Sequence, residues 1–140
     1  MPLGAFIARA DLMSWKKGAH GSTFGGNPVC CRAALETIAL LEEGLMDNAA
    51  NVGRSLLGRL KTLRDASPAL IDLRGLGLMI GLEFQDGDQA DAVADACYRR
   101  GLIVLPCGDK TIRISPPLVV SEEQAETALD ILADAISTLE

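Results

Sequence analysis

Apolar residues recur at helical spacing in two long stretches of the chain. In the first stretch they lie three or four positions apart, at Ala49, Val52, Leu56, Leu60 and Leu63. This pattern predicts an amphipathic helix, which ends at Ser67-Pro68 because the residue before a proline avoids helical backbone. The second stretch has similar spacing, at Ala125, Leu129, Leu132, Ile136 and Leu139. It predicts a last helix, which begins with the capping-box spacing of Ser121 and Gln124.

A further helix is expected over residues 28–43. Asn27 can cap its free amide groups, and Pro28 already has the φ of a first helical turn. Gly44 suits the left-handed position just past the end of this helix. The stretch from Ser14 to Pro28 is rich in glycine and polar residues, so we expect a loop there. An apolar segment that starts at Met1 is expected to be strand-like.

Between residues 69 and 84 the pattern changes to that of strands. Apolar residues lie on both sides of Arg74-Gly75, which predicts a hairpin or a bent pair of strands. A turn at Asp86-Gly87 follows. We expect Asp88 to cap the next helix, which ends at Gly101.

Two short strands are expected between that helix and the last one. Residues 102–105 are predicted to form a buried strand, and a turn at residues 107–109 leads to a strand over residues 111–115. In this second strand Ile112 and Ile114 share one face and Arg113 lies on the other. The order of elements predicts an α+β fold, in which helices cover an antiparallel or mixed sheet.

The composition indicates a protein with a core and without a surface for polyanions. Apolar residues make up 49% of the 140 residues, which suits one globular domain. The net charge is −6 and the 13 basic residues are scattered, so we expect no nucleic-acid partner. Apolar runs are too short to cross a bilayer and no basic leader precedes the apolar start. We therefore expect no membrane partner and a cytoplasmic location.

The four cysteines, Cys30, Cys31, Cys97 and Cys107, show no pattern that indicates a metal site. They lack the paired spacing of zinc ligands and the density of a disulfide scaffold. We expect them to be small packing residues.

The glycine-rich segment from His20 to Pro28 is the first candidate for chemistry. Its glycines let the backbone approach a ligand, the Thr23 hydroxyl can donate to a phosphate oxygen, and the helix that follows favours an anion. The segment resembles half of a phosphate site. The same spacing also suits a loop that only turns the chain into a helix.

Arg113 is the second candidate, because it lies on a short strand next to Pro116-Pro117. An arginine there could hold a substrate carboxylate through two parallel hydrogen bonds. The alternative is an ordinary solvated arginine on an exposed strand face. Periodicity does not decide between the two.

Four motifs together resemble the class III aminotransferases, which are pyridoxal-phosphate-dependent enzymes. The run from Gly18 to Pro28, with the sequence GAHGSTFGGNP, is similar to the signature loop of this family. Pro2-Leu3-Gly4 resembles the segment just after the cofactor lysine. The run from Arg74 to Leu78 resembles the strand motif of the family, and the run from Arg113 to Pro117 resembles its C-terminal arginine motif.

This resemblance implies the C-terminal portion of a fold-type I pyridoxal-phosphate-dependent transferase. Residues 1–28 would be the residual end of the large cofactor-binding domain with its phosphate loop. Residues 29–68 would form long connecting helices, and residues 69–140 the small C-terminal α/β domain.

The resemblance also implies roles for individual residues. Ser22 and Thr23 would lie at the cofactor, with Thr23 contacting the phosphate of the neighbouring subunit, which implies a homodimer. Arg113 would bind the α-carboxylate of amino-acid and keto-acid substrates. His20 would lie beside the cofactor loop without a catalytic step, and we assign no catalytic residue to the chain.

By the same resemblance, the lysine that holds the cofactor would precede Met1, so we expect the chain alone to be inactive. The remaining lysines, Lys16, Lys17, Lys61 and Lys110, occupy polar or solvated positions in the sequence and are poor nucleophiles there.

The parent enzyme is expected to transfer an amino group from an ω-amino donor, with 4-aminobutyrate favoured, to 2-oxoglutarate. The alternative is a stand-alone, non-catalytic module that dimerises or binds a small carboxylate through Arg113. The apolar start favours the fragment, because an unpaired strand with apolar side chains invites aggregation. We expect residues before about Ser22 to be disordered or paired with another copy of the chain.

Overall fold

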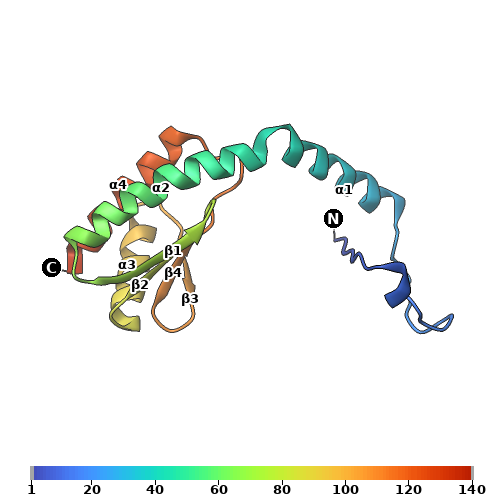
Figure 1. Cartoon of the computed structure of the whole chain (residues 1–140). Coiled ribbons are helices and arrows are strands. Elements are labelled where there is room, and N and C mark those ends of the chain that lie inside the picture. Colours follow the sequence, from blue (N-terminus) through green and yellow to red (C-terminus); the bar gives the residue numbers. More distant parts are fainter. Residues whose placement is uncertain (1, 140) are drawn as a thin grey trace. The chain divides into compact units, whose positions relative to one another are not determined.

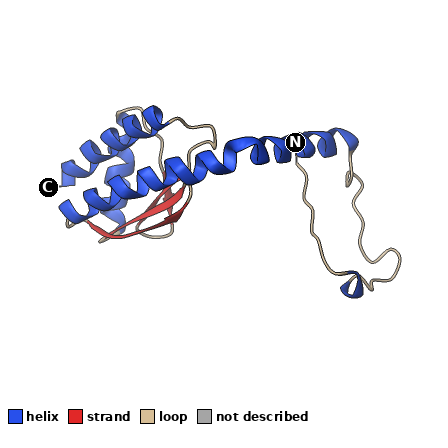
Figure 2. Ribbon diagram, turned by 45° about the horizontal axis from the view of Figure 1, so that its top comes forward, coloured by secondary structure: helices blue, strands red, loops and turns tan. Residues whose placement is uncertain are grey.

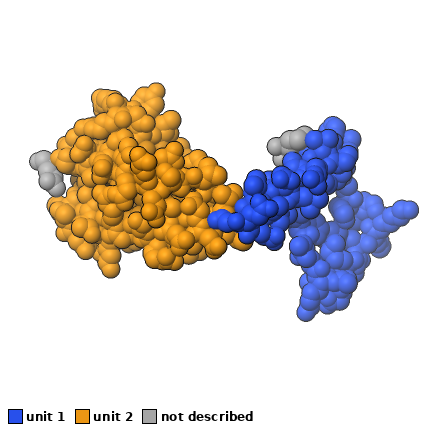
Figure 3. Space-filling view, turned by 90° about the horizontal axis from the view of Figure 1, so that it is seen from above, with its two compact units in different colours: residues 1–44 blue, residues 45–140 orange. Residues whose placement is uncertain are grey.

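Gly44 marks the point at which the chain divides. Its backbone has a φ of 149°, a conformation that residues other than glycine rarely adopt. The protein is described by a computed structural model over residues 2–139, and it separates into the compact units Met1–Gly44 and Leu45–Glu140 (Figure 3). Each unit is described by itself below.

The first unit contains little regular structure before its helix. Residues 2–9 form no strand, so the strand-like segment expected there is wrong for the described residues. A short 3₁₀ helix, η1 (Ala10–Leu12), is followed by a loop that leads to α1 (Pro28–Leu40). Asn27 caps α1 as predicted, since its Oδ1 accepts from the amides of Val29 at 3.0 Å and Cys30 at 3.3 Å. The segment η2 (Leu41–Leu45) follows, and the chain kinks within it at Gly44, whose φ and ψ are not helical.

The second unit is a four-stranded sheet with helices on one face (Figures 1 and 2). The strands are β1 (Leu70–Leu76), β2 (Met79–Phe84), β3 (Leu105–Cys107) and β4 (Thr111–Ile114), in the order β1-β2-β4-β3. All three pairings are antiparallel. The helices are α2 (Met46–Ala66), α3 (Gly87–Arg99) and α4 (Glu122–Ile136), followed by the 3₁₀ helix η3 (Ser137–Leu139). The predicted α+β fold is therefore confirmed, with an antiparallel sheet.

Alternation along β2 shows which face of the sheet is covered. Ile80, Leu82 and Phe84 are buried, whereas Met79 is exposed and Gly81 and Glu83 are partly exposed. The buried side chains meet the predicted apolar stripes of α2 and α4, whose central members are Val52, Leu56, Leu60, Leu129 and Leu132. Ser121 and Gln124 form the predicted capping box at the start of α4. The opposite face of the sheet carries the polar residues.

The resemblance to the aminotransferases predicted that the residues of α2 belong to connecting helices over residues 29–68. It contacts β1 and α4, and so belongs to the same compact unit as the sheet. The division into 1–28, 29–68 and 69–140 concerns the domains of a complete enzyme and stays a prediction.

Two turns differ from the sequence-based expectation. The hairpin between β1 and β2 turns at Gly77-Leu78 and not around Arg74-Gly75, because Gly77 supplies the positive φ, 56°, that a two-residue hairpin turn requires. Asp86, and not Asp88, caps α3, since its Oδ1 accepts from the amide of Gln89 at 2.9 Å. Asp88 lies inside the first turn of that helix.

The expected buried strand over residues 102–105 is also wrong. Leu102 lies just past the end of α3, where its amide caps the helix by donating to the Cys97 carbonyl at 3.0 Å after Gly101 has turned the chain at a φ of 87°. The strand forms later, at Leu105–Cys107, and is exposed. It contains Pro106, which cannot donate to a neighbouring strand and therefore suits this edge of the sheet.

The cysteines have different environments. Cys97 is buried, and burial raises the pKa of its thiol, as expected for a packing residue. Cys107 is exposed, so the expectation that all four cysteines are packing residues is wrong at this position. No helix among residues 2–139 is long and apolar enough to cross a membrane.

Gly53 on α2 allows the β1–β2 hairpin to approach the helix backbone. A Cβ built on Gly53 would lie only 2.2 Å from the carbonyl oxygen of Gly77. That oxygen belongs to the backbone of a tight turn, so it cannot move aside without shifting the hairpin. The close contact between α2 and the hairpin turn therefore depends on glycine at position 53.

We predict that Gly53→Ala destabilises the protein by about 1–3 kcal/mol, because the added methyl group overpacks this contact. The matched control is Gly58→Ala on the same helix, where a Cβ meets nothing within 4 Å. This control should stabilise by roughly 0.5–1 kcal/mol through helix propensity. Urea unfolding measures both variants, and equal effects would show that the contact with Gly77 is not tight.

Candidate functional site

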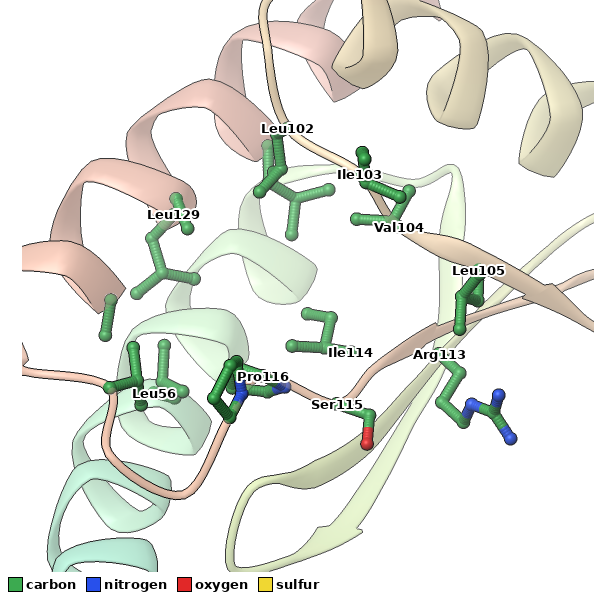
Figure 4. Close-up of a pocket in the computed structure, with 15 residues that line it drawn as sticks. Leu56, Leu102, Ile103, Val104, Leu105, Arg113, Ile114, Ser115, Pro116 and Leu129 are labelled. Carbon is green, nitrogen blue, oxygen red and sulfur yellow. The ribbon is translucent and has the colours of Figure 1, made fainter. Parts of the chain in front are cut away.

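Arg113 lies on the exposed face of the sheet. In the strand register it stands between Gly81 of β2 and Leu105 of β3. Among residues 2–139 its guanidinium has no ion-pair or side-chain hydrogen-bond partner, although its strand is fully paired. Figure 4 shows the guanidinium directed away from the apolar side chains of Leu102, Leu129 and Leu56. The prediction that Arg113 faces away from Ile112 is confirmed, since Ile112 is buried and Arg113 is exposed.

Arg74 occupies the same row of the sheet, because it pairs with Gly81 from the other side. Unlike Arg113 it is held in ion pairs. Its Nη1 donates to Asp72 Oδ2 at 2.7 Å and to Glu83 Oε2 at 2.7 Å. Lys110 Nζ lies 3.2 Å from Glu83 Oε1, which completes a cluster of two carboxylates and two cations.

The ion pairs alter the pKa values of this cluster. The hydrogen bond from Arg74 lowers the pKa of Asp72. Hydrogen bonds from Arg74 and then Lys110 lower the pKa of Glu83. The hydrogen bonds to Asp72 and Glu83 raise the pKa of Arg74. The two negative and two positive charges of the cluster balance at neutral pH. Arg113 lies beside the cluster and forms no ion pair with a carboxylate among the described residues.

An apolar cavity of about 380 Å³ begins beside Arg113 and was not predicted from the sequence (Figure 4). It lies between α2 and α4 and is lined by Leu56, Leu129 and Ile114, among others. Pro116-Pro117 ends β4, because proline cannot continue the ladder of hydrogen bonds. Asn48 holds the chain that follows, since its Nδ2 donates to the carbonyls of Leu118 at 2.7 Å and Val120 at 3.0 Å. Pro116-Pro117 is the sequence feature from which an interruption of the strand at this cavity could have been predicted.

The glycine-rich loop belongs to the first unit. Ser22 and Thr23 are exposed within it, and Gly26 adopts a φ of 69°. The amide of Gly25 donates to the Ser22 carbonyl at 3.4 Å, which folds the loop on itself. The hydroxyls and glycine backbone are compatible with binding a phosphate group.

The helix N-terminus after this loop is less available than the sequence suggested. The side chain of Asn27 already accepts from the amides of Val29 and Cys30. A phosphate at this loop would therefore depend on the hydroxyls and loop amides more than on the first turn of α1.

His20 has an aromatic neighbour. Its ring lies edge-on to Trp15, with 4.8 Å between the ring centroids. Ser22 and Thr23 lie in the first unit and Arg113 in the second, so the two predicted sites are treated separately.

The protein family follows from a match along nearly the whole chain. The family model described as Aminotransferase class-III matches residues 1–136. The chain belongs to the class III aminotransferases. The resemblance carried by the four sequence motifs is thereby confirmed.

Relatives in this family include enzymes with different donors. The chain is 44% identical over 140 residues to acetylornithine aminotransferase of Methanothermobacter thermautotrophicus, a match that covers 99% of this chain and 35% of that protein. It is 40% identical over 144 residues to 4-aminobutyrate aminotransferase of Mycobacterium leprae, covering 95% of this chain and 32% of that protein. The chain thus spans about a third of the length of these curated relatives.

Solved structures of class III aminotransferases share the fold. The ornithine aminotransferase of Toxoplasma gondii, in which PLP partially occupies the active site, superposes with a TM-score of 0.86 at 31% identity, covering 94% of this chain and 32% of that one. The acetylornithine aminotransferase of Elizabethkingia anophelis gives a TM-score of 0.84 at 30% identity, covering 91% of this chain and 33% of that one. Pyridoxal phosphate is the cofactor of this family.

We predict that the protein loses stability in acid through the cluster at Arg74. Asp72 and Glu83 have folded pKa values below their ordinary ones. Their contribution is therefore complete above their unfolded pKa values of about 4 and is lost as the pH falls through the lowered folded values. Thermal melting between pH 6 and pH 3 measures this loss.

The variant Glu83→Gln should show a smaller drop in melting temperature over the same pH range, because one of the two carboxylates no longer titrates. The control is Asp91→Asn, which alters an exposed carboxylate without an ion pair among the described residues. An equal change in both variants would contradict the assignment of the acid sensitivity to this cluster.

Proposed function

We propose that this chain forms the C-terminal part of a pyridoxal-phosphate-dependent aminotransferase that transfers an amino group from an ω-amino donor to 2-oxoglutarate. The observation that carries the proposal is the guanidinium of Arg113, which lies on the exposed face of the sheet and has no ion-pair partner among residues 2–139. Acetylornithine and 4-aminobutyrate aminotransferases both occur among its relatives, and we keep 4-aminobutyrate as the favoured donor.

Arg113 is proposed to bind the α-carboxylate of the amino acid or keto acid. A guanidinium offers two parallel N–H donors that match the two oxygens of a carboxylate. Such a pair fixes the orientation of the substrate as well as its position. The guanidinium is ready for this role because the described residues do not neutralise it, in contrast to Arg74.

Ser22 and Thr23 are proposed to contact the cofactor phosphate, Thr23 across the interface of a homodimer. Their hydroxyls are exposed in a loop whose glycines permit close approach of a ligand. When bound, pyridoxal phosphate supplies the electron sink and carries the amino group. The loop's part is to hold the phosphate in place.

A homodimer is supported by the apolar surface of the first unit. Ile7 is 100% exposed and Phe24 is 84% exposed. Side chains of this kind belong in an interface with further protein. We propose a cytoplasmic enzyme in which another part of the protein or the second subunit covers them.

The chain alone is proposed to have no turnover, because none of its lysines suits covalent attachment of the cofactor. Lys16, Lys17 and Lys61 are exposed, and Lys110 is paired with Glu83. A nucleophilic lysine needs a desolvated site or a neighbouring cation to lower its pKa. Lys16, Lys17 and Lys61 lack surroundings that remove water, and Lys110 is held in an ion pair.

We predict no stoichiometric adduct when the chain is mixed with pyridoxal phosphate, reduced with borohydride and weighed intact. The absorbance spectrum before reduction gives an independent reading. A single specific adduct would overturn the proposal that these lysines are not catalytic, and peptide mapping would identify the one responsible.

Arg113 is tested in the complete enzyme that carries this chain. We predict that Arg113→Lys lowers kcat/KM for 2-oxoglutarate by roughly 30- to 1000-fold, since removing one partner of a charged hydrogen-bonded pair costs about 2–4 kcal/mol. The control is Arg54→Lys, an exposed arginine on α2. If Arg113→Lys and Arg54→Lys both kept the kcat/KM of the parent enzyme, a substrate role for Arg113 would be contradicted.

The stand-alone carboxylate-binding module stays a second candidate, because residues 45–140 have their own core and present Arg113 on their surface. The two candidates differ in activity. Co-expression with the remaining part of a class III aminotransferase restores transamination only for the first candidate, whereas carboxylate binding without restored activity favours the second.

A further inference from the structure

Gly81 lies in the interior of the sheet, where glycine is an unfavourable residue. It is on β2, which has β1 on one side and β4 on the other, and it pairs with Arg74 and Arg113. A glycine inside a strand weakens the strand, because it has no side chain to pack and loses more conformational freedom on folding. Such a glycine often marks a bulge, a tight bend, or a place where a ligand or another backbone approaches closely.

Neither the backbone nor the packing of the sheet requires a glycine at this position. The pairing is regular on both sides of Gly81, and the irregularity between β1 and β2 lies far from it, between Leu70 and Asp72. Its φ is not in the left-handed region. A Cβ on Gly81 would make ordinary contacts among the described residues, at 3.4 Å from Thr111 Cγ2 and 3.8 Å from Arg74 Cγ.

Gly75, on the neighbouring strand, shows what a structural requirement looks like. A Cβ on Gly75 would lie 2.7 Å from the carbonyl oxygen of Met79 and 2.9 Å from Ile80 Cα. These are backbone atoms of the paired strand, which cannot move aside without changing the hairpin. Gly75 is therefore explained by the fold, whereas the explanation that is left for Gly81 is the close approach of a further group to the uncovered face.

The neighbours of Gly81 indicate what kind of group this is. Gly81 and Arg113 are direct partners in the register, so their Cα atoms lie roughly 5 Å apart. The other partner of Arg113 is Leu105, whose side chain lies on the same face, so the open side of Arg113 is the side of Gly81. Beyond Gly81, Arg74 is held in its two ion pairs. An open space next to a guanidinium without an ion-pair partner among residues 2–139 suits an anionic group.

We propose that Gly81 is a specificity-determining residue, whose lack of a side chain leaves room beside Arg113 for the carboxylate end of the substrate. The inference rests on the proposed role of Arg113 as the carboxylate-binding residue. It adds that this end of the site selects by shape as well as by charge. In 2-oxoglutarate the reacting carbonyl carbon is bonded directly to the α-carboxylate, so bulk at Gly81 would displace the reacting carbon together with the carboxylate.

The experiment adds one or three carbon atoms at this position in the complete enzyme that carries this chain. We expect Gly81→Ala to raise KM for 2-oxoglutarate by about ten-fold and Gly81→Val by about 100-fold, because one carbon too many in a fitted site changes recognition by factors of this size. The value of kcat should change less, since a side chain that crowds the bound substrate and the transition state alike acts on KM.

Two further glycine-to-alanine variants serve as controls. Gly58 is exposed on α2, where a Cβ meets nothing within 4 Å, so Gly58→Ala should keep the KM of the parent enzyme. Urea unfolding of the 140-residue chain gives a second reading that does not depend on activity. Gly81→Ala should be at least as stable as the parent chain, whereas Gly75→Ala should be less stable because of its backbone clash.

The remaining outcomes separate this inference from the proposed function. A loss of stability in Gly81→Ala as large as in Gly75→Ala would show that the fold requires the glycine, and would overturn the inference. Parental KM in both Gly81 variants, while Arg113→Lys is impaired, also overturns it and leaves the proposed function standing. If these variants instead impair assembly of the enzyme at parental KM, further protein and not substrate lies over Gly81. If Arg113→Lys keeps the parental kcat/KM, both the proposed function and the inference fail.

Discussion

One-sided burial of the sheet is the constraint on which the rest of the second unit depends. The helices α2 and α3 contact the sheet and α4 packs against both of them, and Ile80, Leu82 and Ile112 are buried on the covered face. Each strand must then place alternate residues on the uncovered face, because side chains alternate along a strand. Arg113 reaches the exposed surface since its neighbours in the chain, Ile112 and Ile114, face the helices. A shift of one residue in β4 would bury the arginine.

Much of this architecture could be predicted because local patterns and tertiary packing agree. The stripes of α2 and α4 and the caps at Asn27 and Ser121 all depend on residues within a few positions of one another. The strand over residues 102–105 failed for the opposite reason. Its apolar run comes directly after α3, and the hydrogen bond from the Leu102 amide to the Cys97 carbonyl uses the start of the run to cap that helix, so the strand begins only at Leu105. The prediction of the hairpin turn at Arg74-Gly75 failed because the turn forms at Gly77, and the difference between Gly75 and Gly77 depends on contacts with Ile80 and Gly53.

The candidate site was predictable as a set of residues and not as an arrangement. Sequence alone suggested Arg113, Ser22 and Thr23, but it could not distinguish Arg113 from Arg74 by their electrostatic surroundings. That difference arises from the register of β1 against β2, which brings Glu83 to Arg74 across nine positions of the chain. The capping of α1 by Asn27 was predicted, yet its consequence for an anion at the loop became clear only when both amides were seen to be occupied.

Both edge strands of the sheet have features that hinder the pairing of a further strand. Pro106 removes a donor from β3 at one edge, and the pairing of β1 is irregular between Leu70 and Asp72 at the other. Both features discourage strand-to-strand addition by another chain. Polymerisation of the protein through its sheet edges is consequently disfavoured by the backbone itself, whatever side chains the uncovered face presents.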